Sequence, residues 1–246
     1  MSSAAGRLKW EQSFGEQVRT AAFNTAPVEA VVRTVAYYLR HHASDRRRLR
    51  FVELGSGAGA NLAWLAQSGI RVSGVDVSPT ALRLARERLN GAGLIEQVDH
   101  LVEGSVASVP FQTEAFDGVI EACVFQHLDR RDREHAFGEV RRLLKLGGLF
   151  VGYMLDVNHT VFVERSSEEL EDDRGTLMLE DAAQSCVYLT NLGLSHFYRR
   201  DEIIDLLKGF SVVDPCLTTY TLPREEARRR GYVEYVQSMW TVYAIK

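Results

Sequence analysis

Three kinds of residue in this sequence could take part in chemistry: a turn with three glycines, an acid at the end of an apolar run, and a few histidines. Gly55, Gly57 and Gly59 follow a short apolar run, and glycine lets backbone N–H groups approach a ligand without a Cβ in the way. A helical pattern follows, so the turn would present its N–H donors at a helix N-terminus. Asp76 ends the next apolar run and suits acceptance of two ribose hydroxyl protons. These residues predict a cradle for a cofactor.

Histidine titrates near neutral pH, which makes it the usual general base. His127 lies shortly after an apolar run at 116–122, while His159 and His196 lie in an irregular stretch further along the chain. Each could remove a proton from an acceptor of the reaction. The alternative for each is a structural histidine held by hydrogen bonds.

The elements that must position these residues alternate between strand and helix. Helical patterns are clearest at 79–90 and 130–145, and the second ends before Gly147 and Gly148. Alternating strands and helices imply a parallel sheet with right-handed crossovers. Ligands of open α/β sheets bind at the carboxyl ends of the strands, and the first and fourth strands would end there. Apolar runs predict the parallel strands at 51–54, 70–76, 98–102, 116–122 and 149–153.

Four segments resemble motifs of the class I S-adenosylmethionine (SAM)-dependent methyltransferases. Glu53 and the three glycines that follow it are similar to the family's first motif, and Ser105 stands where the family often has an aspartate near the adenine. A hydroxyl can still accept that hydrogen bond. The resemblance covers residues 50–153. The other three segments are Gly74-Val75-Asp76-Val77-Ser78-Pro79, Phe125-Gln126-His127-Leu128 and Leu144-Lys145-Leu146-Gly147-Gly148, the last with leucine in place of the family's proline.

The resemblance implies an α/β fold with a Rossmann-like, doubly wound sheet of seven strands. The sheet would end in an antiparallel hairpin, formed here by 210–220 and 239–245. SAM would be the methyl donor and S-adenosylhomocysteine (SAH) the product. The cofactor-binding residues implied are Glu53, Gly55, Ser56, Gly57, Gly59, Asn61, Asp76, Val77, Gly104, Ser105, Val106, Glu121, Ala122 and His127.

One domain is expected for residues 1–246, since a chain of this length can bury a single large core. Around a SAM-binding core at 50–153, a helical cap at 1–45 and an insertion at 155–198 would shape the acceptor pocket, and a helix and strands at 199–246 would complete the sheet. Six acids against two arginines at 164–174 predict a solvent-facing turn or a lid. The candidate substrate-binding residues are Trp10, Phe14, Tyr153, Tyr188 and Tyr198, with plain packing as the alternative for the first two.

Composition argues against several other functions. The net charge is −4, which gives no electrostatic reason to expect a nucleic-acid partner. No run of about 18 apolar residues and no signal-peptide core is present, so no membrane partner and a cytoplasmic location are expected. Neither a disulfide framework nor a metal site is expected, because the three cysteines, Cys123, Cys186 and Cys216, are widely spaced.

We therefore expect a SAM-dependent methyltransferase that transfers a methyl group by SN2 displacement to an oxygen or nitrogen of a small metabolite, as a monomer or homodimer. Orientation of the reactants can supply about 7–11 kcal/mol of the barrier reduction, so a dedicated base is optional. An NAD-dependent oxidoreductase is one alternative, because Gly55-x-Gly57-x-x-Ala60 also fits the dinucleotide fingerprint. A SAM-binding regulatory subunit without turnover is another.

Overall fold

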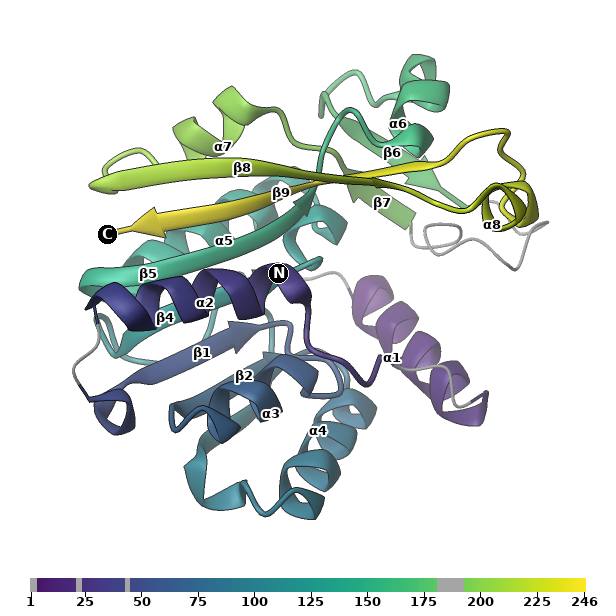
Figure 1. The fold of residues 1–246 in the computed structure, drawn as a ribbon. Coiled ribbons are helices and arrows are strands. Elements are labelled where there is room, and N and C mark those ends of the chain that lie inside the picture. Colours follow the sequence, from purple (N-terminus) through teal and green to yellow (C-terminus); the bar gives the residue numbers. More distant parts are fainter. Residues whose placement is uncertain (1–3, 21–23, 43–44, 181–192) are drawn as a thin grey trace.

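A seven-stranded sheet forms the centre of the protein in a computed structural model that describes residues 4–20, 24–42, 45–180 and 193–246. Its strands are β1 (Arg50–Leu54), β2 (Arg71–Asp76), β3 (Val98–Glu103), β4 (Phe116–Ala122), β5 (Leu144–Leu155), β8 (Val212–Thr221) and β9 (Val236–Ile245). They lie in the order β3-β2-β1-β4-β5-β9-β8 (Figure 1). The first five are parallel, and β9 runs antiparallel between β5 and β8, as predicted for the terminal hairpin.

Helices cover both faces of this sheet, which explains why the parallel strands are apolar almost throughout (Figure 1). Phe51 points to the face covered by α2 (Glu29–His42) and α3 (Ala60–Gln67), whereas Val52 points to the face covered by α5 (Arg130–Leu143). The helices around the sheet are α1 (Ala4–Arg19), α2 (Glu29–His42), α3 (Ala60–Gln67), α4 (Pro79–Gly91), α5 (Arg130–Leu143) and α7 (Arg200–Leu206). The fold is therefore the Rossmann-like, doubly wound architecture that the sequence predicts.

Local capping fixes where the helices beside the site begin. The Ser78 hydroxyl accepts a hydrogen bond from the Ala81 N–H at 3.0 Å, and Pro79 occupies the first helical position of α4. The Asp129 carboxylate accepts from the Asp132 N–H at 2.8 Å and begins α5 in the same way. Both helix starts therefore lie at the carboxyl ends of the strands.

The segment between β5 and α7 builds a separate small unit above the sheet. It contains α6 (Thr160–Arg165) and a two-stranded antiparallel sheet of β6 (Thr176–Leu179) and β7 (Gly193–His196). A third apolar cluster, which includes Leu155, Phe197 and Tyr235, joins this unit to β9 and to α8 (Arg224–Arg229). The hairpin of β6 and β7 was not predicted.

The acidic stretch at 164–174 is packed at its end, where the sequence predicted a solvent-facing turn or a lid. Asp173 accepts a hydrogen bond from the Arg133 guanidinium of α5 at 2.6 Å, and both side chains are almost buried. The Thr176 hydroxyl also donates to Asp173 at 2.7 Å. Arg133 lies 40 positions away in the sequence, and its contact leaves the Asp173 side chain only 12% exposed.

Two element boundaries differ from the prediction. α5 ends at Leu143, and β5 begins at Leu144 rather than at 149. Leu144 pairs with Phe116, and the ladder resumes with Leu149 beside Gly118 after a register shift. The two glycines that predicted a helix stop therefore form an irregularity within the strand. None of the helices in the described residues has the length and apolar composition needed to cross a membrane.

Candidate active site

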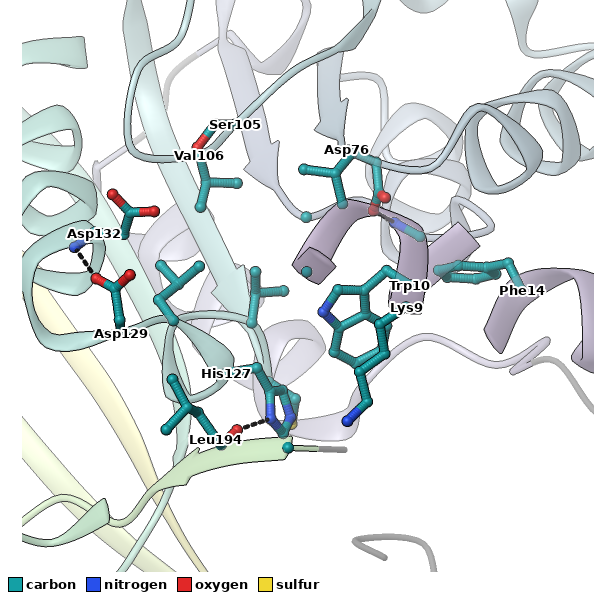
Figure 2. Close-up of a pocket in the computed structure, with 18 of the residues that line it drawn as sticks. Lys9, Trp10, Phe14, Asp76, Ser105, Val106, His127, Asp129, Asp132 and Leu194 are labelled. Carbon is teal, nitrogen blue, oxygen red and sulfur yellow. Dashed lines mark hydrogen bonds between the residues drawn. The ribbon is translucent and has the colours of Figure 1, made fainter. Parts of the chain in front are cut away.

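A cavity of about 470 Å³ lies at the carboxyl ends of β1, β2 and β4 (Figure 2). The glycine turn and Asp76 form one side, and Ser105 and Val106 form another. Trp10 and Phe14 of α1 and Leu194 of β7 also line it. Pockets of this size suit small ligands.

All three glycines of the turn have left-handed conformations, and at Gly59, with φ of +75°, a Cβ would lie 2.9 Å from Ala85. Gly55 and Gly57 have φ values of +82° and +50°, which side-chain-bearing residues rarely adopt. A Cβ on Gly55 would lie 2.3 Å from a methyl group of Val124, and a Cβ on Gly57 would enter the space in front of Phe14, at 3.4 Å. The Gly55 N–H donates to the Val75 carbonyl at 2.8 Å, which ties the turn to β2. The turn is thus held with its backbone facing the cavity.

Asp76 is held at the edge of the same cavity. One carboxylate oxygen accepts from the Gly57 N–H at 2.8 Å and the other from the Ser78 N–H at 2.9 Å. Burial raises the pKa of Asp76, and the negative charge of Glu11 adds to this, while backbone hydrogen bonds from Ser78, Gly57 and Val77 act in the opposite direction. The carboxylate therefore has a fixed orientation beside the turn.

Two further acids lie behind the cavity wall, on opposite faces of the sheet. Glu53 accepts from the Asn61 side-chain amide at 2.6 Å, and burial raises its pKa to about 8. Glu121 accepts from the Val124 and Phe125 N–H groups at 2.6 and 3.1 Å, and burial raises its pKa to about 7. The second oxygen of each carboxyl is buried without a hydrogen-bond partner in the described part of the chain. Because its pKa is about 8, the Glu53 carboxyl is protonated and uncharged at neutral pH.

His127 is a wall residue with both ring nitrogens in hydrogen bonds. The Leu194 carbonyl can only accept, so Nδ1 of His127 carries the proton and donates to it at 3.0 Å. Gln126 accepts from the Leu155 N–H at 3.0 Å, which turns its amide nitrogen toward Nε2 of His127 at 3.4 Å. Burial lowers the pKa of His127 to about 4, and the charge of Lys9 adds to this. The ring is therefore neutral, with its lone pair on Nε2.

The other two candidate bases have structural partners and do not line this cavity. Nδ1 of His159 accepts from the Val161 N–H at 3.2 Å and caps α6, and burial lowers its pKa to about 4. His196 is buried between Thr176 and Glu202, at 2.7 and 2.8 Å. Their hydrogen bonds join the small unit above the sheet to its neighbours.

The structure brings together ten of the residues singled out from the sequence. Eight predicted to bind cofactor and two predicted to bind substrate line the cavity: Gly55, Gly57, Asp76, Val77, Ser105, Val106, Ala122, His127, Trp10 and Phe14. The other predicted cofactor residues lie outside its lining: Glu53, Ser56, Gly59, Asn61, Gly104 and Glu121. Tyr153 and Tyr198 are also outside it, and Tyr198 is fully buried in the core; Tyr188 falls outside the described residues.

Several lining residues were missed by the sequence reasoning. Cys123 is in the left-handed region, with φ of +61°, at the end of β4. No motif marks it. Met178 and Leu194 reach the cavity through the small two-stranded sheet, Lys9 lies within α1, and Asp129 and Asp132 lie at the start of α5. Within the described residues, no group of three histidine, cysteine, aspartate or glutamate side chains could hold a metal ion.

Comparisons with known proteins agree with this geometry. Residues 52–152 match a family model described as a methyltransferase domain. The rice (Oryza sativa) protein 24-methylenesterol C-methyltransferase 2 is 34% identical over 105 residues, 42% of this chain and 28% of that protein. An uncharacterized methyltransferase of Anoxybacillus flavithermus is 28% identical over 151 residues, 60% of this chain and 66% of that protein. The chain thus spans less than two thirds of the length of these curated relatives.

Solved structures show the same fold. A SAM-dependent methyltransferase of Methanosarcina mazei has a TM-score of 0.64 at 20% identity, covering 83% of this chain and 95% of that one. The 1,6-didemethyltoxoflavin-N1-methyltransferase of Burkholderia thailandensis, solved with its substrate and SAH, has a TM-score of 0.61 at 17% identity, covering 99% and 88%. Residues 52–152 thus match a methyltransferase domain, and the chain shares the fold of these solved methyltransferases.

Proposed function

We propose that this protein is a SAM-dependent methyltransferase whose acceptor is a small molecule bound in the cavity of Figure 2. The observation that carries the proposal is that the glycine turn and the Asp76 carboxylate share one cavity with Trp10, His127 and Leu194. The glycine turn and Asp76 suit a nucleoside-containing ligand. Trp10 comes from α1, His127 from the turn after β4, and Leu194 from the two-stranded sheet of β6 and β7. Such an enclosure suits a small acceptor better than a polymer.

The residues present fit the cofactor of the family. When bound, SAM supplies a sulfonium methyl group that an acceptor atom can take by SN2 displacement. The backbone at Gly55 and Gly57 would hold it, Asp76 would accept from the ribose hydroxyls, and Ser105 and Val106 would border the adenine. Because Gly57 has no side chain, the space between its backbone and the Phe14 ring, which a Cβ would enter, stays open to the ligand.

We propose that orientation and desolvation of the acceptor account for most of the acceleration of methyl transfer. His127 is the one of the three predicted bases that lines this cavity, and its low pKa keeps it neutral. A neutral ring can accept a proton, but the Nε2 lone pair faces Gln126. His127 would act as a base only after Nε2 turned from Gln126 toward the acceptor. Its first role is therefore to hold the cavity wall through Leu194.

The acceptor atom is proposed to be oxygen or nitrogen. Lys9, Asp129 and Asp132 in the cavity wall could bind the polar groups of such an acceptor. The Burkholderia neighbour, named as an N1-methyltransferase, supports nitrogen. Carbon is a second candidate, because the rice relative is named as a C-methyltransferase.

We also propose a cytoplasmic location, a monomeric or homodimeric state and no nucleic-acid partner. The net charge of −4 supports the last point. Sedimentation of the purified protein would determine the oligomeric state directly.

Incubation with SAM labelled in its methyl group tests the proposal. The acceptors offered would be a low-molecular-mass extract, total protein and total nucleic acid, each separately. We expect label in the small-molecule fraction alone, with loss of transfer when Asp76 is replaced by alanine. Label in protein or nucleic acid, or no transfer at all, would contradict the proposal. Mass spectrometry of the labelled product then distinguishes methylated oxygen, nitrogen and carbon.

A further inference from the structure

Helix α1 is fastened to the start of α4 by a single acid. Glu11 accepts hydrogen bonds from the Ser78 and Thr80 hydroxyls, each at 2.5 Å, and from the Thr80 N–H at 3.2 Å. Burial would raise the pKa of Glu11, but these hydrogen bonds outweigh it and lower the pKa below its usual value. A charged carboxylate at the N-terminus of a 13-residue helix is also favoured by the helix dipole. The contact is therefore made by an anion.

The partner of Glu11 belongs to the cofactor side of the cavity. Ser78 caps α4 with its hydroxyl, which accepts from the Ala81 N–H, and donates its own N–H to Asp76 at 2.9 Å. Asp76 in turn accepts from Gly57 of the glycine turn. A continuous chain of hydrogen bonds thus runs from α1 through Ser78 and Asp76 to the turn.

On the same helix, residues beside Glu11 form part of the cavity wall. Trp10 lies next to it in the chain and packs against His127, with ring centroids 5.3 Å apart. Phe14 lies one helical turn further on and faces Gly57 (Figure 2). Fixing Glu11 therefore fixes both aromatic side chains over the cavity.

The described ion pair between α1 and the sheet is exposed. Arg7 reaches Glu103 at 2.5 Å, but the two side chains are 51% and 45% exposed. Exposed pairs of this kind contribute little. Glu11 is consequently the main polar anchor of α1 among the described contacts.

We propose that Glu11 is a positioning residue for cofactor binding: it holds α1 closed over the cavity and links that closure to the orientation of Asp76. This inference rests on the proposed function, since the ligand enclosed is SAM or SAH. Release of ligand requires α1 to move from the start of α4, so the hydrogen bonds of Glu11 oppose release. When α1 is already displaced from α4, the ligand can enter the cavity without breaking the hydrogen bonds of Glu11.

Stopped-flow binding of SAH to the full-length protein tests this. We expect Glu11→Ala to raise the dissociation rate constant about tenfold or more, the scale of losing hydrogen bonds to a charged group, and to change the association rate constant less than about twofold. Glu11→Gln, which keeps a carbonyl acceptor, should recover part of the loss. The matched control is Glu16→Ala on α1, because Glu16 pairs only with Arg19 in the described contacts and should leave both constants unchanged.

A second variant separates this role from simple folding of α1. Thr80→Val removes one hydroxyl that donates to Glu11 and leaves Asp76 untouched. It should raise the dissociation rate constant, and the double variant with Glu11→Ala should show less than the product of the two effects. Independent effects, or an unchanged dissociation rate constant in folded Glu11→Ala protein, would overturn the inference. Failure of the wild-type protein to bind SAH would overturn the proposed function as well.

Discussion

The backbone N–H of Gly57 donates to the Asp76 carboxylate at 2.8 Å, which joins the turn after β1 to the end of β2. The two residues were singled out separately, one as a place for backbone donors and the other as an acceptor for ribose hydroxyls. Their direct bond shows that Asp76 has two tasks, since it orders the turn and also faces the cavity. The loss of either residue should therefore affect cofactor binding.

Asp76→Ala should weaken SAH binding by about 1.5–3 kcal/mol, roughly a ten- to hundredfold rise in the dissociation constant. The cause is the loss of a buried charged acceptor that also holds the turn. Isothermal titration calorimetry measures this. Asp99→Ala is the control, because Asp99 binds Arg50 and Arg71 away from the cavity lining and should leave the dissociation constant within about twofold. An unchanged constant in Asp76→Ala would remove Asp76 from the cofactor site.

Gly57→Val should abolish SAH binding while the protein stays folded. A branched side chain at Gly57 would enter the space before Phe14, at a backbone conformation that valine disfavours. Gly93→Val is a matched control, since Gly93 also has a positive φ, +70°, but has open space around its Cβ position. It should lower the melting temperature and retain SAH affinity. Retained affinity in folded Gly57→Val protein would be incompatible with a cradle at this turn.

The His127 ring should stay neutral until the pH falls to about 4, with its proton on Nδ1. Because its folded pKa lies below the unfolded value of about 6.5, its contribution to stability is present above pH ~6.5 and is lost as the pH falls toward 4. Nitrogen-15 NMR of the imidazole reports both the tautomer and the titration. Gln126→Leu removes the donor to Nε2 and should change the tautomer population. A wild-type ring that titrates near pH ~6.5 would contradict the burial that the structure shows.

Glu53→Gln should stabilise the ligand-free protein at alkaline pH. The folded pKa of Glu53 is raised to about 8, so the folded state binds the extra proton and loses stability as the pH rises from about 4.5 through 8. Glutamine keeps the oxygen that accepts from Asn61 and cannot ionise. Urea unfolding at about pH 6 and about pH 9 should show a gain that is larger by a few kcal/mol at the higher pH. Equal differences at the two pH values would show that Glu53 does not ionise on this scale.

The parallel half of the fold could be predicted because its signals are local. Ser78 and Pro79 mark the start of α4, and the apolar run at 116–122 matches β4 in full. The continuous apolar runs follow from the burial of both faces of the sheet. By contrast, Gly147 and Gly148 were misleading, since a register shift in β5 accommodates glycines that also suit a helix end.

The site could be predicted mainly where a local motif marks it. The glycine turn and Asp76 have such a motif. Glu11 binds Ser78 across 67 positions of sequence, and no pattern within α1 distinguishes it from Glu16, the other acid of that helix. Leu194 reaches the cavity through a hairpin whose two strands have four residues each, too short for a clear alternation. Contacts of this kind are set by tertiary packing, which sequence periodicity does not record.

The most direct test of the central claim is calorimetric titration of the ligand-free protein with SAH and, separately, with NADH. The account predicts saturable binding of one SAH per chain and no heat of binding from NADH, because the turn and Asp76 hold an adenosyl group in a cavity of the methyltransferase fold. Binding of NADH with SAH excluded, or binding of neither ligand, would contradict the assignment of this cavity to SAM.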